Sequence, residues 1–289
     1  MLNMPHDPGN GAAADDLERM EANRAMWDER VPIHVAGDFY AVEEFRSRAQ
    51  RLTVREFEID ELGDVDGRTL LHLQCHFGLD TLSWGRLGAR VTGLDFSGPA
   101  VAAATALARD TGIDAEFVQA DLYDAVSALD GRQFDVVYTG KGAIGWLPDI
   151  RRWADVCATL LAPGGTFYLS EFHPAGNVFA WESLELEFSY FDPAPTFDDS
   201  SGTYADFDAV TSHNASYQWQ HTLGAVITAL IDAGLRIEFL HEQAFTLFRR
   251  WPFLEERDDR SFVLPAGIPN LPLMFSVRAV KRWNDGPTN

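Results

Sequence analysis

The sequence predicts an α/β fold built on a mostly parallel sheet with helices on both faces. Short apolar runs alternate with helical patterns of roughly ten to fifteen residues, which is typical of strand–helix–strand units. Polar residues and glycines follow directly after the apolar runs, where strands of such a sheet end. Of the 289 residues 46% are hydrophobic and 23% charged, a composition and length that fit one large globular domain.

The charge balance restricts the classes of partner. There are 44 acidic residues against 23 basic ones, so the formal net charge is -21. Such a surface repels phosphate backbones and anionic lipids, and we therefore expect neither a nucleic acid nor a membrane as partner. No apolar run approaches the roughly 18 residues of a membrane span. Cys75 and Cys157 lie in apolar runs and predict buried, reduced thiols of a cytoplasmic protein.

The N-terminal part divides into a leader and a helical cap. Residues 1–15 are rich in Gly, Ala, Pro and Asp, and we expect a disordered leader there. Residues 16–62 predict a cap made of separate helical pieces, because apolar residues recur among charged ones. Trp27, His34 and Tyr40 belong to this cap.

The central part, residues 68–171, carries the strongest strand and helix signals. Strands are predicted at residues 68–74, 90–95, 115–119, 134–139 and 166–171. Helices are predicted from Leu79 to Leu87, from the N-cap residue Ser97 to Gly112, and over residues 150–161.

The C-terminal part, residues 217–289, completes the sheet. One apolar face of a helix covers residues 223–231, and Gly234 stands at its C-terminal cap. Strands are predicted at 235–241 and 275–281, which makes seven in all. The connection of residues 242–274 between them is too long for a tight hairpin.

Two acidic residues stand where a parallel sheet binds its ligand, at the carboxyl ends of the strands. Asp95 ends the second strand, and a carboxylate there can accept hydrogen bonds from both ribose hydroxyls. Asp121 follows the third strand and can accept one from an adenine amino group. Each acid alone also fits a helix N-cap or a solvated loop. Two acids at consecutive strand ends favour a nucleoside site.

The loop after the first strand argues against a dinucleotide. Residues 74–78 read QCHFG and lack the G-x-G-x-x-G pattern whose amides close on a pyrophosphate. S-adenosylmethionine has no phosphate, and its sulfonium cation suits an acidic, aromatic site.

Five motifs resemble, in order, those of the class I S-adenosylmethionine-dependent methyltransferases. They are residues 70–78 (LLHLQCHFG), 93–95 (GLD), 119–121 (QAD), 134–138 (FDVVY) and 161–165 (LAPGG). The resemblance implies a Rossmann-like, seven-stranded sheet with S-adenosylmethionine as cofactor. It also implies methyl transfer to an oxygen, nitrogen or carbon atom of a small-molecule acceptor. A non-catalytic protein that binds S-adenosylmethionine is the alternative.

The resemblance implies ten cofactor-binding residues, grouped by strand end. They are Gln74, Cys75 and His76 beneath the methionine part, Gly78 as the glycine kept in that loop, Asp95 at the ribose, Phe96 beside the adenine, Asp121 and Leu122 at the adenine amino edge, and Thr139 and Gly140 near the amino group and sulfonium.

The first motif departs from the family pattern of an acid followed by three alternating glycines. His72 replaces the acid, and Gln74 and His76 replace the first two glycines. Either the loop rises and Gln74 or His76 contacts the cofactor, or the pocket is weakened. We favour the first outcome because every later motif is complete. We expect no metal site at His72, Cys75 and His76, because strand and turn geometry points these side chains apart.

The methyl-acceptor side is predicted from the residues that follow the fifth strand. His173 and Glu171 are the candidate catalytic bases, since a histidine titrates near pH 6.5 and both residues lie at the active edge. A histidine before Pro174 fits equally a residue that pins a chain turn. Residues 172–216 hold nine aromatic rings and predict a lid over an apolar acceptor pocket, or a small extra core under a long loop.

Overall fold

The computed structural model of the chain describes residues 10–283. Residues 1–9 of the expected leader lie outside this range. Residues 10–15 correct the prediction of a leader, because they form the first turns of helix α1 (Asn10–Ala36). Three consecutive alanines, residues 12–14, favour helix there, since alanine has the highest helix propensity.

Seven strands form the main sheet, and this confirms the predicted fold class. In sheet order they are β3 (Ala115–Gln119), β2 (Arg90–Asp95), β1 (Thr69–Leu73), β4 (Phe134–Gly140), β5 (Leu161–Phe172), β12 (Met274–Lys281) and β8 (Leu235–Gln243). The first five run parallel, and β12 is antiparallel to both β5 and β8. The order reverses direction between β1 and β4, so the ligand-binding crevice is expected beside these two strands.

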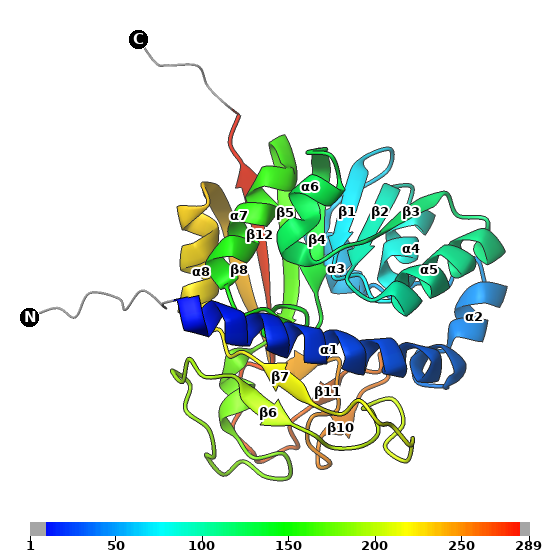
Figure 1. The fold of residues 1–289 in the computed structure, drawn as a ribbon. Helices are drawn as coiled ribbons and strands as arrows, with labels where there is room; N and C mark the ends of the chain where they lie inside the picture. Colours follow the sequence, from blue (N-terminus) through cyan, green and yellow to red (C-terminus); the bar gives the residue numbers. More distant parts are fainter. Residues whose placement is uncertain (1–9, 284–289) are drawn as a thin grey trace, which may run out of the picture.

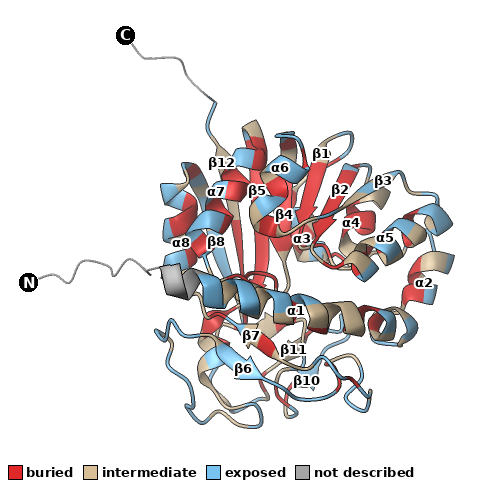
Figure 2. Cartoon of the chain, in the orientation of Figure 1, coloured by how far each residue is buried: buried red, intermediate tan, exposed pale blue. Residues whose placement is uncertain are grey.

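Helices cover both faces of the sheet (Figure 1). Helices α7 (Ile150–Leu160) and α8 (Leu223–Asp232) pack on one face, with Trp153 fully buried. Helices α3 (Glu56–Leu62) and α4 (Leu79–Arg86) pack on the other, with Trp84 fully buried. Figure 2 shows the central strands buried between these layers. Such burial on both faces is why the strands read as continuous apolar runs.

The predicted ends of two helices agree with the structure. Ser97 caps helix α5 (Gly98–Thr111), because its hydroxyl accepts a hydrogen bond from the Ala100 amide at 3.3 Å. Gly112 ends α5 in the left-handed region at φ 68°, a conformation that glycine adopts without strain.

The helical cap is less broken than predicted. Helix α1 is continuous despite Pro32 inside it, and it runs across the edge of the sheet where the parallel strands end (Figure 1). Helix α2 (Val42–Ser47) follows, and then α3. Among the residues that the structure describes, no helix is long and apolar enough to cross a membrane.

Two long connections face α1 at the same edge of the sheet (Figure 1). The 172–216 insertion contains a 3-10 helix, η3 (Pro174–Val178), and strand β6 (Thr196–Asp198), which pairs with β7 (Ser216–Gln218). The connection between β8 and β12, residues 244–273, forms a small sheet of β9 (Phe245–Thr246), β10 (Glu255–Glu256) and β11 (Phe262–Val263).

A small second core joins these two connections. Trp251 is fully buried at its centre, and Phe179 and Leu184 of the insertion pack against it. Other aromatic residues of the insertion remain exposed, among them Trp181, Phe191 and Phe207. The expected extra core therefore accounts for part of the aromatic set and leaves the rest for another role.

Candidate functional site

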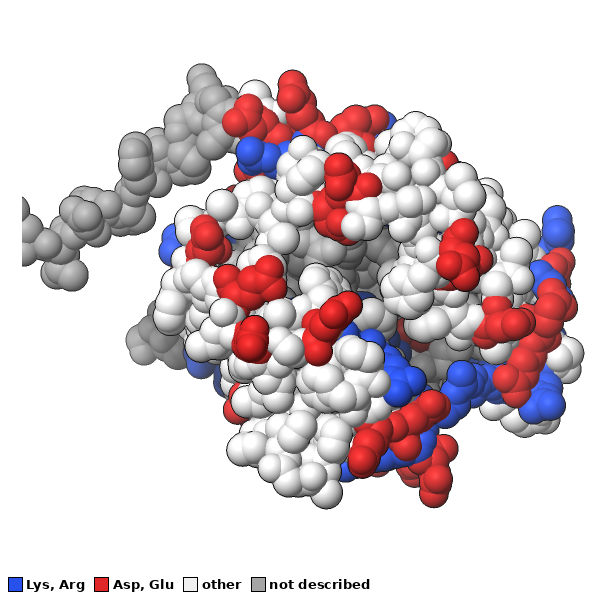
Figure 3. All heavy atoms as spheres, turned by 90° about the horizontal axis from the view of Figure 1, so that it is seen from below, with Lys and Arg blue, Asp and Glu red and all other residues white. Residues whose placement is uncertain are grey.

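The carboxyl ends of the parallel strands open into one large cavity. It has a volume of about 2060 Å³ and is lined by strand-end residues, by α1 and by both long connections. Figure 3, a view from below Figure 1, shows a hollow in this end of the molecule. Single small-molecule sites occupy roughly 300–1,000 Å³, so this cavity has room for a cofactor and a second substrate together.

The loop after β1 keeps the backbone shape of a glycine loop without its glycines. Gln74 has φ 55° and His76 has φ 51°, in the left-handed region that side chains other than glycine rarely adopt. The Cys75 amide donates to the Leu94 carbonyl at 3.0 Å, and the His76 amide donates to Asp95 Oδ2 at 2.8 Å. These bonds hold the loop on the end of β2, so the substitutions do not lift it away.

The His76 side chain makes contacts that a glycine could not. Its Nε2 lies 3.0 Å from Nδ1 of His34 on α1, and the His34 Nε2 lies 2.6 Å from the Thr203 hydroxyl of the insertion. The Trp27 ring meets the His76 ring edge-on at 5.2 Å. Burial lowers the pKa of His76 to about 3 and that of His34 to about 4, so both rings are neutral at pH 7.

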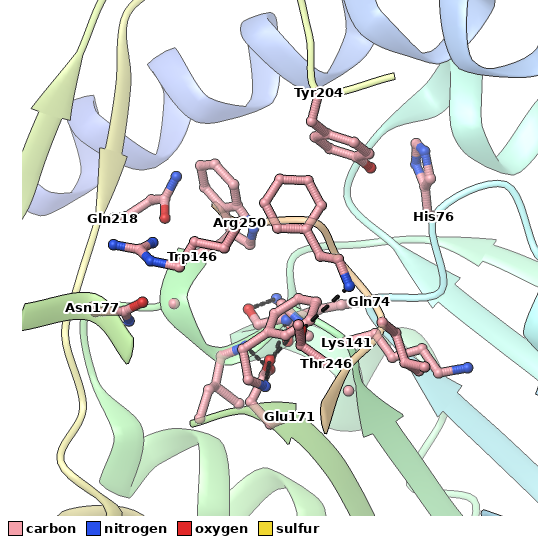
Figure 4. A pocket seen from close by; sticks show the side chains of 18 of the residues that line it. Gln74, His76, Lys141, Trp146, Glu171, Asn177, Tyr204, Gln218, Thr246 and Arg250 are labelled. Atoms are coloured by element: carbon pink, nitrogen blue, oxygen red, sulfur yellow. Dashed lines mark hydrogen bonds between the residues drawn. The ribbon is translucent and has the colours of Figure 1, made fainter. Parts of the chain in front are cut away.

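A pair of tyrosines strengthens the same junction. The hydroxyls of Tyr40 and Tyr204 share a hydrogen bond, and the Tyr204 ring lies 4.9 Å from that of His34. We call His34, Tyr40, His76, Thr203 and Tyr204 the latch. It joins the cap, the β1 loop and the insertion at the cavity wall, and Figure 4 shows two of its members, His76 and Tyr204. The sequence placed His34 and Tyr40 in the cap, but no spacing in the sequence predicted their contacts with Thr203 and Tyr204.

Gln74 offers an unused hydrogen-bond acceptor to the cavity. Its amide nitrogen donates to the Ala143 carbonyl at 2.8 Å, which fixes the orientation of the side chain. Its Oε1 is buried and has no hydrogen-bond partner among the described residues. Because buried polar atoms are normally satisfied, this oxygen fits the ammonium group of a bound S-adenosylmethionine.

Asp95 lies buried at the end of β2 and lines the cavity. One carboxylate oxygen accepts from the His76 amide at 2.8 Å and the other from the Ser97 amide at 2.9 Å. Each oxygen keeps a second lone pair, as two ribose hydroxyls require. Burial raises the pKa of Asp95 to about 6 despite these two bonds. The neighbouring Phe96 also lines the cavity.

The other predicted cofactor residues divide between the cavity and the interior. Asp121 Oδ1 accepts a hydrogen bond from the Tyr123 amide at 2.8 Å and thereby acts as the N-cap that the sequence offered as an alternative. The second carboxylate oxygen of Asp121 takes no part in this cap. Leu122 and Gly140 line the cavity, and a side chain at Gly140 would collide with the Ser170 carbonyl. Thr139 is fully buried within the sheet and does not reach the cavity.

The loop residues Cys75 and Gly78 have structural surroundings as well as a place in the cavity wall. Burial raises the pKa of the Cys75 thiol, which keeps it protonated and unreactive. Gly78 begins α4 at φ 82°. Within residues 10–283 no three His, Cys, Asp or Glu side chains lie close enough together to bind a metal ion.

Glu171 shapes the loop after β4. Its carboxylate accepts from the amides of Gly142, Ala143 at 2.8 Å, Ile144 at 3.2 Å and Phe172 at 2.7 Å. Burial raises its pKa, while these four bonds act in the opposite direction. Two amides donate to each oxygen of the Glu171 carboxylate, so its lone pairs are occupied (Figure 4). This geometry fits a residue that anchors the loop and argues against the expected role of Glu171 as a catalytic base.

His173 is also occupied. Its Nδ1 accepts from the Ala175 amide at 3.1 Å and thereby caps η3. A neutral ring in this state carries its proton on Nε2, which lies 2.9 Å from Glu242 Oε1 without hydrogen-bond geometry. Burial lowers its pKa, and Glu242 partly opposes that effect. No ring nitrogen is left to accept a proton. The structure therefore favours the alternative role of His173, in which it pins the chain turn.

A buried ion cluster that the sequence did not predict supports the cavity floor. Lys141 Nζ lies 2.9 Å from Glu58 and 2.7 Å from Asp80, and Tyr138 donates to Glu58 at 2.7 Å. The cluster ties α3 and α4 to the loop after β4. Its members are too far apart in the sequence for a motif, although Lys141 directly follows the predicted Gly140.

Comparisons with known proteins agree with this geometry. Residues 71–167, about a third of the chain, match the family model described as "Methyltransferase domain". The ubiquinone biosynthesis O-methyltransferase of Salmonella arizonae is 32% identical over 115 residues, which are 40% of this chain and 47% of that protein. The same enzyme of Salmonella typhimurium matches equally. The matched region therefore spans about half the length of these curated relatives.

Solved structures share the fold at low sequence identity. An S-adenosylmethionine-dependent methyltransferase from Mesorhizobium loti has a TM-score of 0.52 at 20% identity, covering 82% of this chain and all of that one. The CcbJ methyltransferase from Streptomyces caelestis has a TM-score of 0.53 at 16% identity, covering 83% and 90%. These neighbours share the fold of the chain, and residues 71–167 carry the match to a methyltransferase domain.

Proposed function

We propose that this protein transfers a methyl group from S-adenosylmethionine to an oxygen, nitrogen or carbon atom of a small molecule. The observation that carries this proposal is the position of Asp95. Its buried carboxylate faces the same cavity as the aromatic insertion, so a cofactor held there would lie next to the space for a second substrate.

The residues of the chain divide the work of binding. Asp95 would hold the ribose hydroxyls, Gln74 Oε1 the cofactor ammonium, and the free oxygen of Asp121 the adenine amino group. When bound, S-adenosylmethionine supplies an electrophilic methyl group on its sulfonium. Phe96, Leu122 and Gly140 line the same part of the cavity and would complete the pocket.

We infer that the protein contributes alignment and exclusion of water more than proton transfer. Both candidate bases, Glu171 and His173, use their acceptor atoms for backbone amides. Alignment of two substrates in a closed site is by itself a large rate effect. The latch closes one side of the cavity, and aromatic rings of the insertion would cover a bound acceptor on the other side.

We further propose a small molecule and not a nucleic acid as methyl acceptor, since a net charge of -21 opposes binding of a polyanion. The two free cysteines, Cys75 and Cys157, are buried, which supports the expected cytoplasmic location.

The test supplies S-adenosylmethionine with an isotope-labelled methyl group and a small-molecule extract of cells. We expect the label to appear in a low-molecular-weight product and S-adenosylhomocysteine to form in equal amount. Asp95→Ala should abolish both at low cofactor concentration. Tight binding of S-adenosylmethionine without any labelled product across extracts would favour the non-catalytic alternative.

A further inference from the structure

Arg250 is a half-buried cation in the cavity wall that the cofactor site does not use. It follows β9 in the 244–273 connection, and its guanidinium packs 4.5 Å over the Trp181 ring and 5.5 Å from the Trp251 ring. Nη2 donates to the Phe179 carbonyl at 2.9 Å. Two aromatic rings and one hydrogen bond thus fix the side chain in place before any ligand arrives.

This guanidinium has no carboxylate partner among the described residues. Its Nε is buried without a hydrogen bond, and burial alone lowers the pKa of Arg250 to about 10. Lys141, another cation at the cavity, differs from Arg250 because Glu58 and Asp80 neutralise its charge. A desolvated cation without a partner lowers the stability of a fold. The chain has 44 acidic residues, yet none of the described ones pairs with Arg250.

Two amide side chains lie around the same part of the cavity. Asn177 and Gln218 line it, and no hydrogen bond engages their side chains within the described part of the chain. Figure 4 shows both amides on the side of the pocket toward which the Arg250 guanidinium points. Together the three residues present N–H donors that converge on one region, a pattern suited to a negatively charged group.

An aromatic wall connects this region with the β1 loop. The Phe248 ring lies 5.9 Å from Tyr204 and 6.2 Å from Phe172. Tyr204 belongs to the latch and lies 6.3 Å from Trp27, which contacts His76. A molecule that reaches from the cofactor side to Arg250 therefore rests on rings along its length.

We propose that the methyl acceptor is a carboxylic acid with an apolar or aromatic body, and that Arg250 binds its carboxylate. The fork of Nε and Nη donors matches a planar carboxylate, with Asn177 and Gln218 adding amide donors. The body lies along the aromatic wall, which directs the opposite end of the molecule toward the cofactor site. This inference rests on the proposed methyl transfer, since it identifies the substrate class of the same cavity.

The test compares acids with their neutral amides. Protein saturated with S-adenosylhomocysteine is titrated with benzoate, phenylacetate and indole-3-acetate, and with the primary amide of each. Saturation-transfer NMR ranks the six probes, and calorimetry gives the affinity of the best acid. We expect at least one acid to bind about tenfold or more tightly than its amide, because hydrogen bonds to charged groups have that strength.

Two variants separate Arg250 from general charge effects. Arg250→Gln should remove the preference for the acid, whereas Arg260→Gln, which deletes an exposed charge at the same cavity, should keep it within about twofold. Both should bind S-adenosylhomocysteine as the unchanged protein does, which shows that they fold. Equal binding of every acid and its amide, or an unchanged preference in Arg250→Gln, would overturn the inference. Failure of the unchanged protein to bind S-adenosylhomocysteine would instead refute the proposed function.

Discussion

Replacement of His76 by glycine restores the commoner family residue at a position with φ 51°. If the histidine were merely tolerated, glycine should stabilise the protein, because a non-glycine residue in the left-handed region costs about 1–2 kcal/mol. The structure predicts the opposite sign. The imidazole contacts His34, Trp27 and Phe77, and the variant would lose all three contacts.

The magnitude follows from these contacts. Loss of a packed, partly buried ring of this size costs about 2–3 kcal/mol. The unpaired His34 nitrogen adds about 1 kcal/mol, and the freedom of glycine in the unfolded chain adds about 0.5–1 kcal/mol. After subtraction of the relieved strain, we expect His76→Gly to lower the free energy of unfolding by about 1.5–4 kcal/mol.

Urea denaturation followed by circular dichroism measures this change. Asp130→Gly is the matched control, because Asp130 is exposed at φ 53° and its side chain makes no hydrogen bond within the described residues. It should be neutral or stabilise the protein by up to about 1 kcal/mol. If His76→Gly is as stable as the unchanged protein or more so, the latch does not hold the β1 loop and our interpretation of the departure is wrong.

Four further predictions concern the site. Asp95 must be ionised to accept ribose hydroxyls, so affinity for S-adenosylhomocysteine should fall as the pH drops through about 6, and Asp95→Asn should lack this dependence. The same raised pKa makes the ionised form unfavourable in the fold, so Asp95 should lower the unfolding free energy as the pH rises from 3.8 to about 6, a trend absent from Asp95→Asn. Glu171→Gln turns an amide NH2 toward backbone donors and should cost about 2–4 kcal/mol in urea denaturation, whereas an unchanged stability would exclude the loop-anchor role. His173→Ala should lower stability by about 0.5–2 kcal/mol, as loss of a cap does, and leave labelled-methyl transfer within a few-fold; a hundredfold loss of rate at intact stability would restore His173 as a base.

Local signals predicted the fold because the sheet is built from short, regular units. Ser97 and Gly112 bound α5 as caps, and Leu70 and Leu71 lie in a strand buried on both faces. Asp95 could be placed in the site for a similar reason, since the end of a parallel strand fixes the edge of the sheet that its last residue faces.

Contacts between distant segments could not be predicted in this way. The partners of His34 and Tyr40 are Thr203 and Tyr204, about 165 residues later, in a stretch without regular periodicity. The 244–273 connection gave no signal of the core around Trp251 or of the place of Arg250 in the cavity wall. For Glu171 and His173, position at a strand end suggested chemistry, whereas their hydrogen-bond partners, which only the fold reveals, occupy the lone pairs.

The most direct test of the central claim is a calorimetric titration of the unchanged protein and of Asp95→Ala with S-adenosylhomocysteine. We predict one binding site per chain in the unchanged protein. The variant should remain folded and bind more weakly by about 1.5–3 kcal/mol, the usual strength of hydrogen bonds to a charged group. No binding to the unchanged protein, or equal affinity in folded Asp95→Ala, would contradict a cofactor site at the end of β2.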